Sequence, residues 1–151
     1  MNHETPLSRR RLRTWLRLLR VTRATENRLR EYLRLTHETT LPRFDVMAAL
    51  YNSEEPMMMS ELSKRLLVSN GNASTVVNRL EKDGLVERQA QEKDRRVVKV
   101  SLTDAGRATF QAQAVGHEKM VNDIFETLGH EEIDMIRDLL RRAEDRKAQS
   151  K

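Results

Sequence analysis

The chain has 151 residues, of which 34% are charged and 38% hydrophobic, and its formal net charge is +5. This length fits one ordinary domain, so we expect residues 1–151 to form a single domain. No apolar run approaches the ~20 residues that a membrane span requires, and the polar, then arginine-rich N-terminus lacks the pattern of a secretory signal. The chain has no cysteine, which excludes disulfide bonds and thiol-based redox sensing.

The basic charge lies mainly in the first predicted element, a helix over residues 8–35. Residues 1–35 hold ten Arg against three Glu, a balance of +7. Apolar residues recur in this segment near helical spacing, and arginines lie between them. The apolar positions are Leu12, Trp15, Leu16, Leu19, Leu29, Tyr32 and Leu33. The arginines have three open roles: a solvated outer face, contact with flanking DNA, or binding of an anionic small molecule. A basic membrane-binding helix is a further alternative, against which stands the place of this segment in the expected dimer interface.

The middle of the chain predicts two short helices and a small strand. Leu41–Tyr51 has the pattern of a helix with Pro42 near its start. Met57–Met59 is expected to add a small strand beside a later hairpin. Ser60–Val68 is a short amphipathic helix.

The next segment, residues 69–84, has two different faces when it is drawn as a helix. Ser69 suits the N-cap and Gly84 falls where a C-terminal cap is expected. The apolar face, which can pack on the preceding helix, consists of Ala73, Val76, Val77 and Leu80. The opposite face consists of Gly71, Ser74, Thr75, Asn78, Arg79 and Lys82. With Ser69 and Asn70, this face can enter a DNA major groove, although alone it also fits a solvated surface helix.

Two β-rich runs, 85–90 and 97–102, follow this helix and alternate with period two. The polar connection between them lacks an Asn-Gly pair, which predicts a longer loop rather than a tight turn. That loop projects Lys93, Arg95 and Arg96. An arginine placed there can enter a narrow minor groove.

Asp94, in the same loop, is better placed to pair with a nearby arginine and hold the loop's shape. The order of helix, short turn, helix and hairpin with a basic tip is typical of a winged helix-turn-helix. We assign this DNA-binding region to residues 42–103.

Two more helices, 104–128 and 131–147, are predicted after the hairpin, the first capped by Thr103 and Asp104. Their apolar positions are Val115, Val121, Ile124, Phe125, Leu128, Ile133, Ile136, Leu139, Leu140 and Ala143. Neither face has an obvious partner in so small a chain, so a second subunit would bury them. We therefore expect a mainly helical α+β protein with dimerisation helices at 8–35 and 104–148.

The sequence offers little for an enzyme. Its four histidines are scattered, and it has no His-Glu-x-x-His motif, Gly-rich phosphate loop or cysteine nucleophile. Its carboxylates suit surface helix faces better than a general-acid pair. We expect no catalytic activity, no metal and no cofactor. His117 fits either the border of a ligand cavity or an ordinary surface or interface position.

Two motifs around the hairpin carry a family resemblance. Asp-Arg-Arg at 94–96 and Leu-Thr-Asp-Ala-Gly at 102–106 resemble the Asp-x-Arg…Leu-Thr-x-x-Gly signature of the MarR family of bacterial transcriptional regulators, and residues 80–88 resemble that family's recognition-helix exit. The resemblance covers nearly the whole chain. It implies a homodimer with interlocking terminal helices and one winged helix per subunit on a pseudo-palindromic operator in double-stranded DNA. It also implies that Arg96 is the minor-groove arginine and Asp94 its structural partner.

Three stretches, 41–45, 61–63 and 68–72, are similar to family members that regulate aromatic-acid catabolism, some answering to hydroxycinnamoyl-coenzyme A. This similarity implies a repressor of a catabolic operon that an aromatic acid or its coenzyme A thioester releases. Arginine forks on the first helix would suit coenzyme A phosphates. Family pockets lie between the dimerisation helices and the winged helix. The candidates for lining one are Trp15, Arg17, Leu19, Arg20, Arg43, Phe44, Met47, Tyr51 and His117.

Two other functions remain open at this stage. One is an architectural or weakly specific DNA-binding protein without an effector, which a flat sequence preference would support. The other is a winged-helix module for protein contacts, which the absence of a salt-dependent DNA affinity would support. For the regulator, we expect a location in the bacterial cytoplasm, associated with the nucleoid, and no membrane partner.

Overall fold

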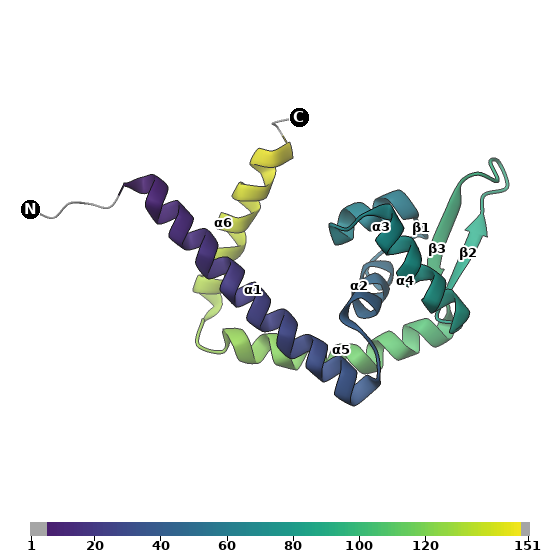
Figure 1. Cartoon of the computed structure of the whole chain (residues 1–151), viewed down its shortest axis with the longest axis horizontal. Helices are drawn as coiled ribbons and strands as arrows, with labels where there is room; N and C mark the ends of the chain where they lie inside the picture. Colours follow the sequence, from purple (N-terminus) through teal and green to yellow (C-terminus); the bar gives the residue numbers. More distant parts are fainter. Residues whose placement is uncertain (1–5, 149–151) are drawn as a thin grey trace, which may run out of the picture.

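The computed structural model describes residues 6–148 as helices around a small antiparallel sheet (Figure 1). In chain order the elements are α1 (Leu7–His37), α2 (Leu41–Tyr51), β1 (Met57–Met58), α3 (Met59–Leu66), α4 (Asn70–Lys82), β2 (Val86–Ala90), β3 (Val98–Leu102), α5 (Asp104–Phe125) and α6 (His130–Ala148). Helices α2 to α4 and the sheet form one lobe, and α1, α5 and α6 form an arm beside and below it (Figure 1). The predicted fold class, mainly α with a small β wing, is confirmed.

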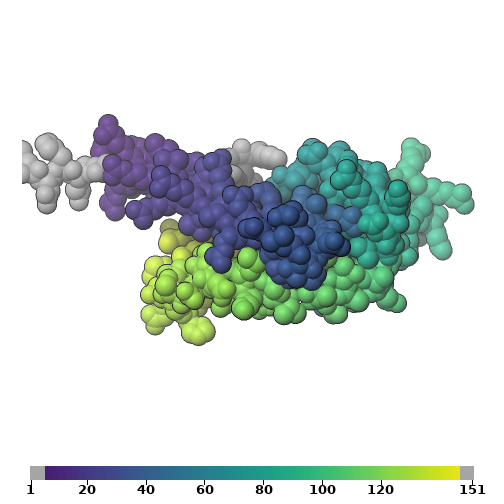
Figure 2. Space-filling view, turned by 60° about the horizontal axis from the view of Figure 1, so that its bottom comes forward, coloured from purple at the N-terminus to yellow at the C-terminus, as the bar shows by residue number. Residues whose placement is uncertain are grey.

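Helix α1 is anchored at its C-terminal end only. Leu29 and Leu33 are buried there, where α1 packs on α5 and α2. The N-terminal half is exposed, and Trp15 keeps 56% of its surface accessible. Figure 2 shows this half, in purple, projecting away from the teal winged-helix lobe. The helix ends at Glu38, which adopts a left-handed φ of 50° and donates its backbone N–H to the Leu33 carbonyl.

Helix α2 forms the centre of the core. Its start is set by the Thr40 side chain, which accepts a hydrogen bond from the Arg43 backbone N–H, and by Pro42 in the first turn. Leu41, Phe44, Val46, Met47, Ala49 and Leu50 are all buried. The helix packs on α1 and α5 of the arm and on α3 and α4 of the winged helix. It therefore connects the two parts of the molecule.

Helices α3 and α4 form the helix-turn-helix. Leu67 ends α3 in a left-handed conformation with φ of 56°. The Ser69 side chain then accepts a hydrogen bond from the Asn72 backbone N–H and caps α4, as predicted. The face of α4 toward the core buries Ala73, Val77 and Leu80. Gly84, with φ of 75°, turns the chain from α4 into the hairpin.

The sheet has the strand order β1-β3-β2, and both pairings are antiparallel. Met57 pairs with Val100, and Val86 pairs with Leu102. Met57, Val86 and Val100 are buried against the helices. The predicted small strand beside the wing is confirmed over two residues. It stops at Met58 because the Glu61 carboxylate accepts that residue's backbone N–H and starts α3.

The start of α5 lies directly against the turn that leads into β2. The Thr103 hydroxyl donates to the Gly84 carbonyl at 2.7 Å and accepts the Gly106 backbone N–H at 3.0 Å. This confirms the predicted Thr103 cap. A Cβ added to Gly106 would lie 1.8 Å from the Leu85 carbonyl oxygen. Only glycine therefore allows this close approach between helix and turn.

The boundary between the last two helices differs from the prediction. Helix α5 ends at Phe125, three residues earlier than expected, and α6 begins at His130. The Leu128 backbone N–H donates to the Phe125 carbonyl at 2.9 Å, which closes a turn after α5. The Glu132 carboxylate accepts the Gly129 backbone N–H at 2.7 Å. This carboxylate caps α6 from its first turn, where a preceding Ser or Thr would usually do so.

The arm exposes many large apolar side chains. These are Leu7, Leu12, Trp15, Leu16, Leu18, Val21 and Leu35 on α1, Val115 on α5, and Met135, Leu139 and Leu140 on α6. Monomeric proteins rarely leave so many apolar side chains together in water. None of the helices within residues 6–148 is long and apolar enough to cross a membrane.

Candidate nucleic-acid interface

The outer face of α4 is polar and accessible. Its exposed members are Gly71, Thr75, Asn78, Arg79 and Lys82. Ser74, also predicted to lie on this face, is only half exposed. The Thr75 hydroxyl donates to the Gly71 carbonyl at 3.0 Å within the helix. The side chains on this face that are most available to bind a ligand are therefore those of Asn78, Arg79 and Lys82.

Two predicted contact residues at the start of α4 also stabilise the turn. The Ser69 side chain is 3.2 Å from the Asn72 backbone N–H that it caps. The Asn70 side-chain oxygen accepts a hydrogen bond from the hydroxyl of Ser63 on α3. Space around the Cα of Gly71 is open, with nothing within 4 Å of an added Cβ. The first turn can therefore approach a phosphate through its backbone, while its side chains hold α3 and α4 together.

The wing projects its three basic side chains into solvent. Lys93, Arg95 and Arg96 are exposed, and the Arg96 side chain is 95% accessible. Asp94 Oδ1 accepts the Arg96 backbone N–H at 3.0 Å and lies 3.8 Å from Arg96 Nε. The Asp94 carbonyl accepts the Val97 backbone N–H at 3.0 Å. Asp94 thus holds the shape of the loop through its contacts with Arg96, as the sequence predicted.

Two ion pairs connect α4 with its neighbours. Arg43 Nη2, on α2, lies 2.5 Å from Asp83 Oδ2 at the end of α4. Arg88 Nη1, on β2, lies 3.4 Å from Glu81 Oε1. Arg43, one of the predicted ligand residues, directs its guanidinium to the end of α4 in its pair with Asp83, and its contact with a ligand stays a prediction. Forty residues separate Arg43 from Asp83, so no local pattern pointed to this pair.

Part of the predicted ligand set forms an aromatic cluster between α2 and α5. Phe44 stacks on His117 with ring centroids 4.3 Å apart and lies 5.2 Å from Phe110. Tyr51 lies 4.7 Å from Phe110. Burial lowers the pKa of His117 and so favours its neutral form. Met47, another predicted ligand residue, is fully buried in the core.

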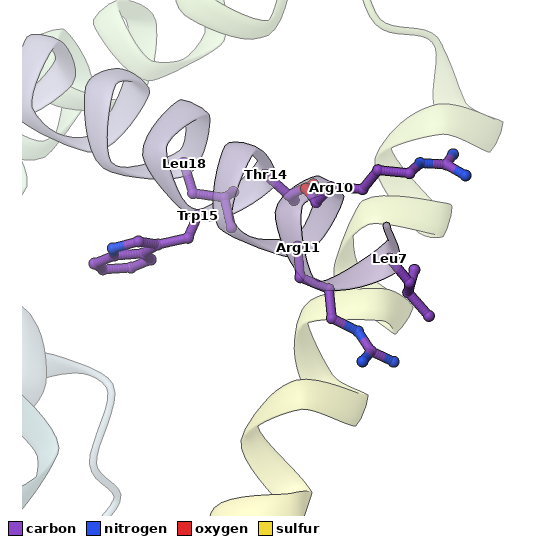
Figure 3. Close-up of a pocket in the computed structure, with 6 residues that line it drawn as sticks. All are labelled: Leu7, Arg10, Arg11, Thr14, Trp15 and Leu18. Carbon is purple, nitrogen blue, oxygen red and sulfur yellow. Dashed lines mark hydrogen bonds between the residues drawn. The ribbon is translucent and has the colours of Figure 1, made fainter. Parts of the chain in front are cut away.

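Four other predicted ligand residues lie on the projecting half of α1. These are Trp15, Arg17, Leu19 and Arg20. Trp15 borders an open hollow of about 420 Å³ whose lining residues all belong to α1 (Figure 3). This half of α1 lies apart from the aromatic cluster (Figure 1). The predicted nine-residue site is therefore divided within the described chain, because a straight helix cannot return its first turns to the lobe.

A larger pocket, of about 640 Å³, adjoins α4 and is lined by α1, α2, the α3–α4 turn and α4. Its charged residues are Glu26, Arg30 and Asp45, none of them among the predicted site residues. The pKa of Asp45 is raised to about 6: loss of solvent contributes most, the Glu26 carboxylate adds to the rise, and the Arg30 guanidinium opposes it. Part of the Asp45 side chain remains exposed. The sequence signal that could have pointed to this pocket is Asp45 itself, an acidic residue in the otherwise apolar and basic helix α2.

Residues 39–98 match the model of the MarR family. The matched segment runs from the N-cap of α2 through the helix-turn-helix and the wing to the first residue of β3. The winged helix of this chain belongs to the MarR family.

Similarity to individual MarR-type proteins extends over both lobe and arm. An HTH-type transcriptional regulator of Bacillus cereus (strain ATCC 10987 / NRS 248) is 28% identical over 127 residues, 83% of each chain. The crystal structure of a MarR family transcriptional regulator from Silicibacter pomeroyi is 28% identical, with a TM-score of 0.76, and the match covers 95% of this chain and 99% of that one. Streptococcus pneumoniae FabT in complex with DNA is 25% identical, with a TM-score of 0.73 and coverage of 93% and 99%. The chain thus resembles MarR-type transcriptional regulators over both lobe and arm, and its winged helix belongs to that family.

Proposed function

We propose that this MarR-family protein binds a specific pseudo-palindromic operator and represses transcription until a small molecule releases it. The observation that carries the proposal is the exposed polar face of α4, followed at once by a wing with three exposed cations. Asn78, Arg79 and Lys82 would contact base edges and phosphates in a major groove. Arg96 would enter the adjacent minor groove. Such a target places the protein on the chromosome, in the bacterial cytoplasm.

The repressor would act as a homodimer. A second copy would cover the apolar side chains that the arm exposes, including Trp15 on α1 and Leu139 on α6. Residues 8–35 and 104–148 would then be the dimerisation helices, and residues 42–103 the DNA-binding region. Dimerisation would set two α4 helices about one helical turn (~34 Å) apart, which is the spacing of successive major grooves on one face of DNA.

The proposed effector is an aromatic acid or its coenzyme A thioester. The pocket beside α4 has the volume of a small-molecule site, and the rings of Phe44, Tyr51 and His117 lie on the neighbouring helices α2 and α5. Arg17 and Arg20 on α1 carry charge complementary to the phosphates of coenzyme A. An effector that prefers a dimer with a different spacing of the two α4 helices would shift the population and release DNA.

DNA binding and effector response can be tested together. We would measure binding of the full chain to the DNA upstream of its own gene at physiological salt, with and without coumaroyl-coenzyme A and simple aromatic acids. Specific binding that one of these ligands releases is the expected result. Specific binding that none of them changes would remove the proposed effector class and leave the regulator. Binding without sequence preference would contradict the repressor and favour an architectural DNA-binding protein.

A further inference from the structure

Helix α2 lies between the arm and the recognition helix α4. Two consecutive residues of α2 contact these two neighbours, one residue on each side of the helix. Phe44 is buried and stacks on the ring of His117 in α5. Arg43 points to the other side and pairs with Asp83 at the end of α4. A change in the position of α2 would therefore reach the C-terminal end of α4 through one side chain.

Among the ion pairs of the described residues, the Arg43–Asp83 pair has the shortest distance between its charged atoms. Its two closest atoms are 2.5 Å apart, and the Arg43 side chain is only 22% accessible. Among the described residues, Arg43 Nε is one of two buried side-chain atoms that have no hydrogen-bond partner. Arg43 is the more buried partner of the pair, because the Asp83 side chain stays 49% accessible, so loss of the carboxylate would leave a partly buried cation without its counter-ion.

Asp83 also gains from the pair. It is the C-cap of α4, and its backbone N–H donates to the Arg79 and Glu81 carbonyls. A carboxylate at a helix C-terminus meets the negative end of the helix dipole, which is an unfavourable place for it. The Arg43 cation offsets that repulsion and links the end of α4 to α2.

The surroundings of Arg43 leave it no role in the pocket. Its neighbours Pro42 and Asp45 line the pocket beside α4, whereas Arg43 is not among the lining residues. The other end of α4 is held separately, by the hydrogen bond between Ser63 and Asn70. Arg43 thus adds a contact from α2 to the C-terminal end of α4, which the Arg88–Glu81 pair holds from β2.

We infer that Arg43 is a positioning residue for DNA readout, which fixes the end of α4 through Asp83 and so sets how the outer face of α4 meets base edges. The inference rests on the proposed DNA-binding function. Arg79 and Lys82 lie in the last turn of α4, so they are the contact residues whose position depends most on this end. Arg43 itself does not touch DNA in this account.

The test compares specific with non-specific binding. The specific probe is a duplex enriched from a randomised pool by the wild-type full chain, and the other probe is an unrelated duplex of the same length. Arg43→Gln and Asp83→Asn should each weaken specific binding by about tenfold, the effect of losing one coupled contact. Non-specific affinity should change less than about twofold, because the phosphate-binding side chains remain in place. Thermal unfolding identifies any variant that is not folded at the assay temperature.

The controls separate positioning from charge. Arg141→Gln breaks a pair on α6 whose atoms are 3.1 Å apart and removes the same charge far from α4. Once sedimentation velocity shows that this variant has the oligomeric state of the wild type, both of its affinities should be unchanged. Exchanging the partners, Arg43→Asp with Asp83→Arg, should restore part of the specific affinity that Arg43→Gln loses.

Three results would overturn the inference. In the first, folded Arg43→Gln and Asp83→Asn bind the specific probe like wild type. In the second, both probes lose affinity equally, which would make Arg43 a phosphate contact. In the third, the exchanged pair is no better than the single variants. A wild-type protein that enriches no sequence would instead contradict the proposed function, and the inference with it.

Discussion

Asp45 is the residue whose environment changes its chemistry most. It lies at the pocket between α1, α2 and α4, and its pKa is raised to about 6 from 3.8. Loss of solvent contributes most to this shift, and the neighbouring Glu26 adds to it. An effector that enters the pocket would therefore meet a carboxyl group that can be neutral in mildly acidic conditions.

Replacement of this carboxyl should stabilise the protein at neutral pH. Between pH 3.8 and about 6 the folded state binds more protons than the unfolded state, so the free energy of unfolding falls as pH rises through this window. Asp45→Asn removes the dependence and should raise the free energy of unfolding by about 1 kcal/mol at pH 7, less than the full shift implies because the group is partly exposed. Urea unfolding at about pH 4 and pH 7 measures it. Equal differences between wild type and variant at both pH values would contradict the assignment.

Arg96 can be removed without affecting the fold. Its side chain is almost fully accessible and its closest charged neighbour is Asp94 within the same loop. Arg96→Ala should weaken specific DNA binding by about 1–3 kcal/mol and leave the unfolding midpoint unchanged. Parallel titrations and thermal melts check both statements. Wild-type affinity in this variant would remove Arg96 from the minor groove.

At the level of elements, the junction between α5 and β2 determines where the wing stands on the arm. Gly106→Ala places a methyl group 1.8 Å from the Leu85 carbonyl oxygen, so helix and turn must separate. We expect a loss of about 3 kcal/mol or more in the free energy of unfolding. Gly71→Ala is the matched control, because its Cβ meets open space and should change stability by less than about 1 kcal/mol. Equal effects of the two substitutions in urea unfolding would refute the close approach.

Local signals in the sequence were enough to predict most elements. Pro42 predicted the start of α2, and the period-two alternation of residues 85–90 and 97–102 predicted the wing. Ser69 and Thr103 predicted the starts of α4 and α5. The end of α5 was predicted three residues too late, because Leu128 continues the apolar spacing and only the turn at Phe125 breaks the helix.

The site was harder to predict than the elements. Exposed faces follow from helical periodicity, so the polar face of α4 could be assigned before the structure was known. Contacts between different elements could not be predicted in this way. The Arg43–Asp83 ion pair and the Ser63–Asn70 hydrogen bond depend on how the helices pack, which the spacing of residues in the sequence does not show. The pocket around Asp45 likewise requires three helices to be placed against one another.

For the whole molecule, the apolar side chains that the projecting arm exposes to solvent require an explanation. Trp15, Leu139 and Leu140 are 56%, 53% and 42% accessible, which is unusual for large apolar side chains in a finished surface. We expect Leu139→Asp to shift the protein from dimer to monomer, because a carboxylate buried in an apolar interface is unfavourable. Sedimentation velocity measures the change, with Asp138→Asn as a neighbouring control that should remain dimeric. A monomeric wild type would contradict the dimer.

Loss of the dimer should also weaken operator binding far more than the loss of any single contact. Two linked winged helices bind two half-sites, and the second binding event is intramolecular. A Leu139→Asp monomer that binds a full operator as tightly as wild type would show that one winged helix is sufficient.

The central claim is that a pair of α4 helices reads a pseudo-palindromic operator. The most direct test is to incubate the wild-type chain with a randomised pool of duplexes at physiological salt and sequence the DNA that it retains. We predict two inverted half-sites whose centres lie about one helical turn apart. Enrichment of a single unpaired motif, or of no motif, would contradict the claim.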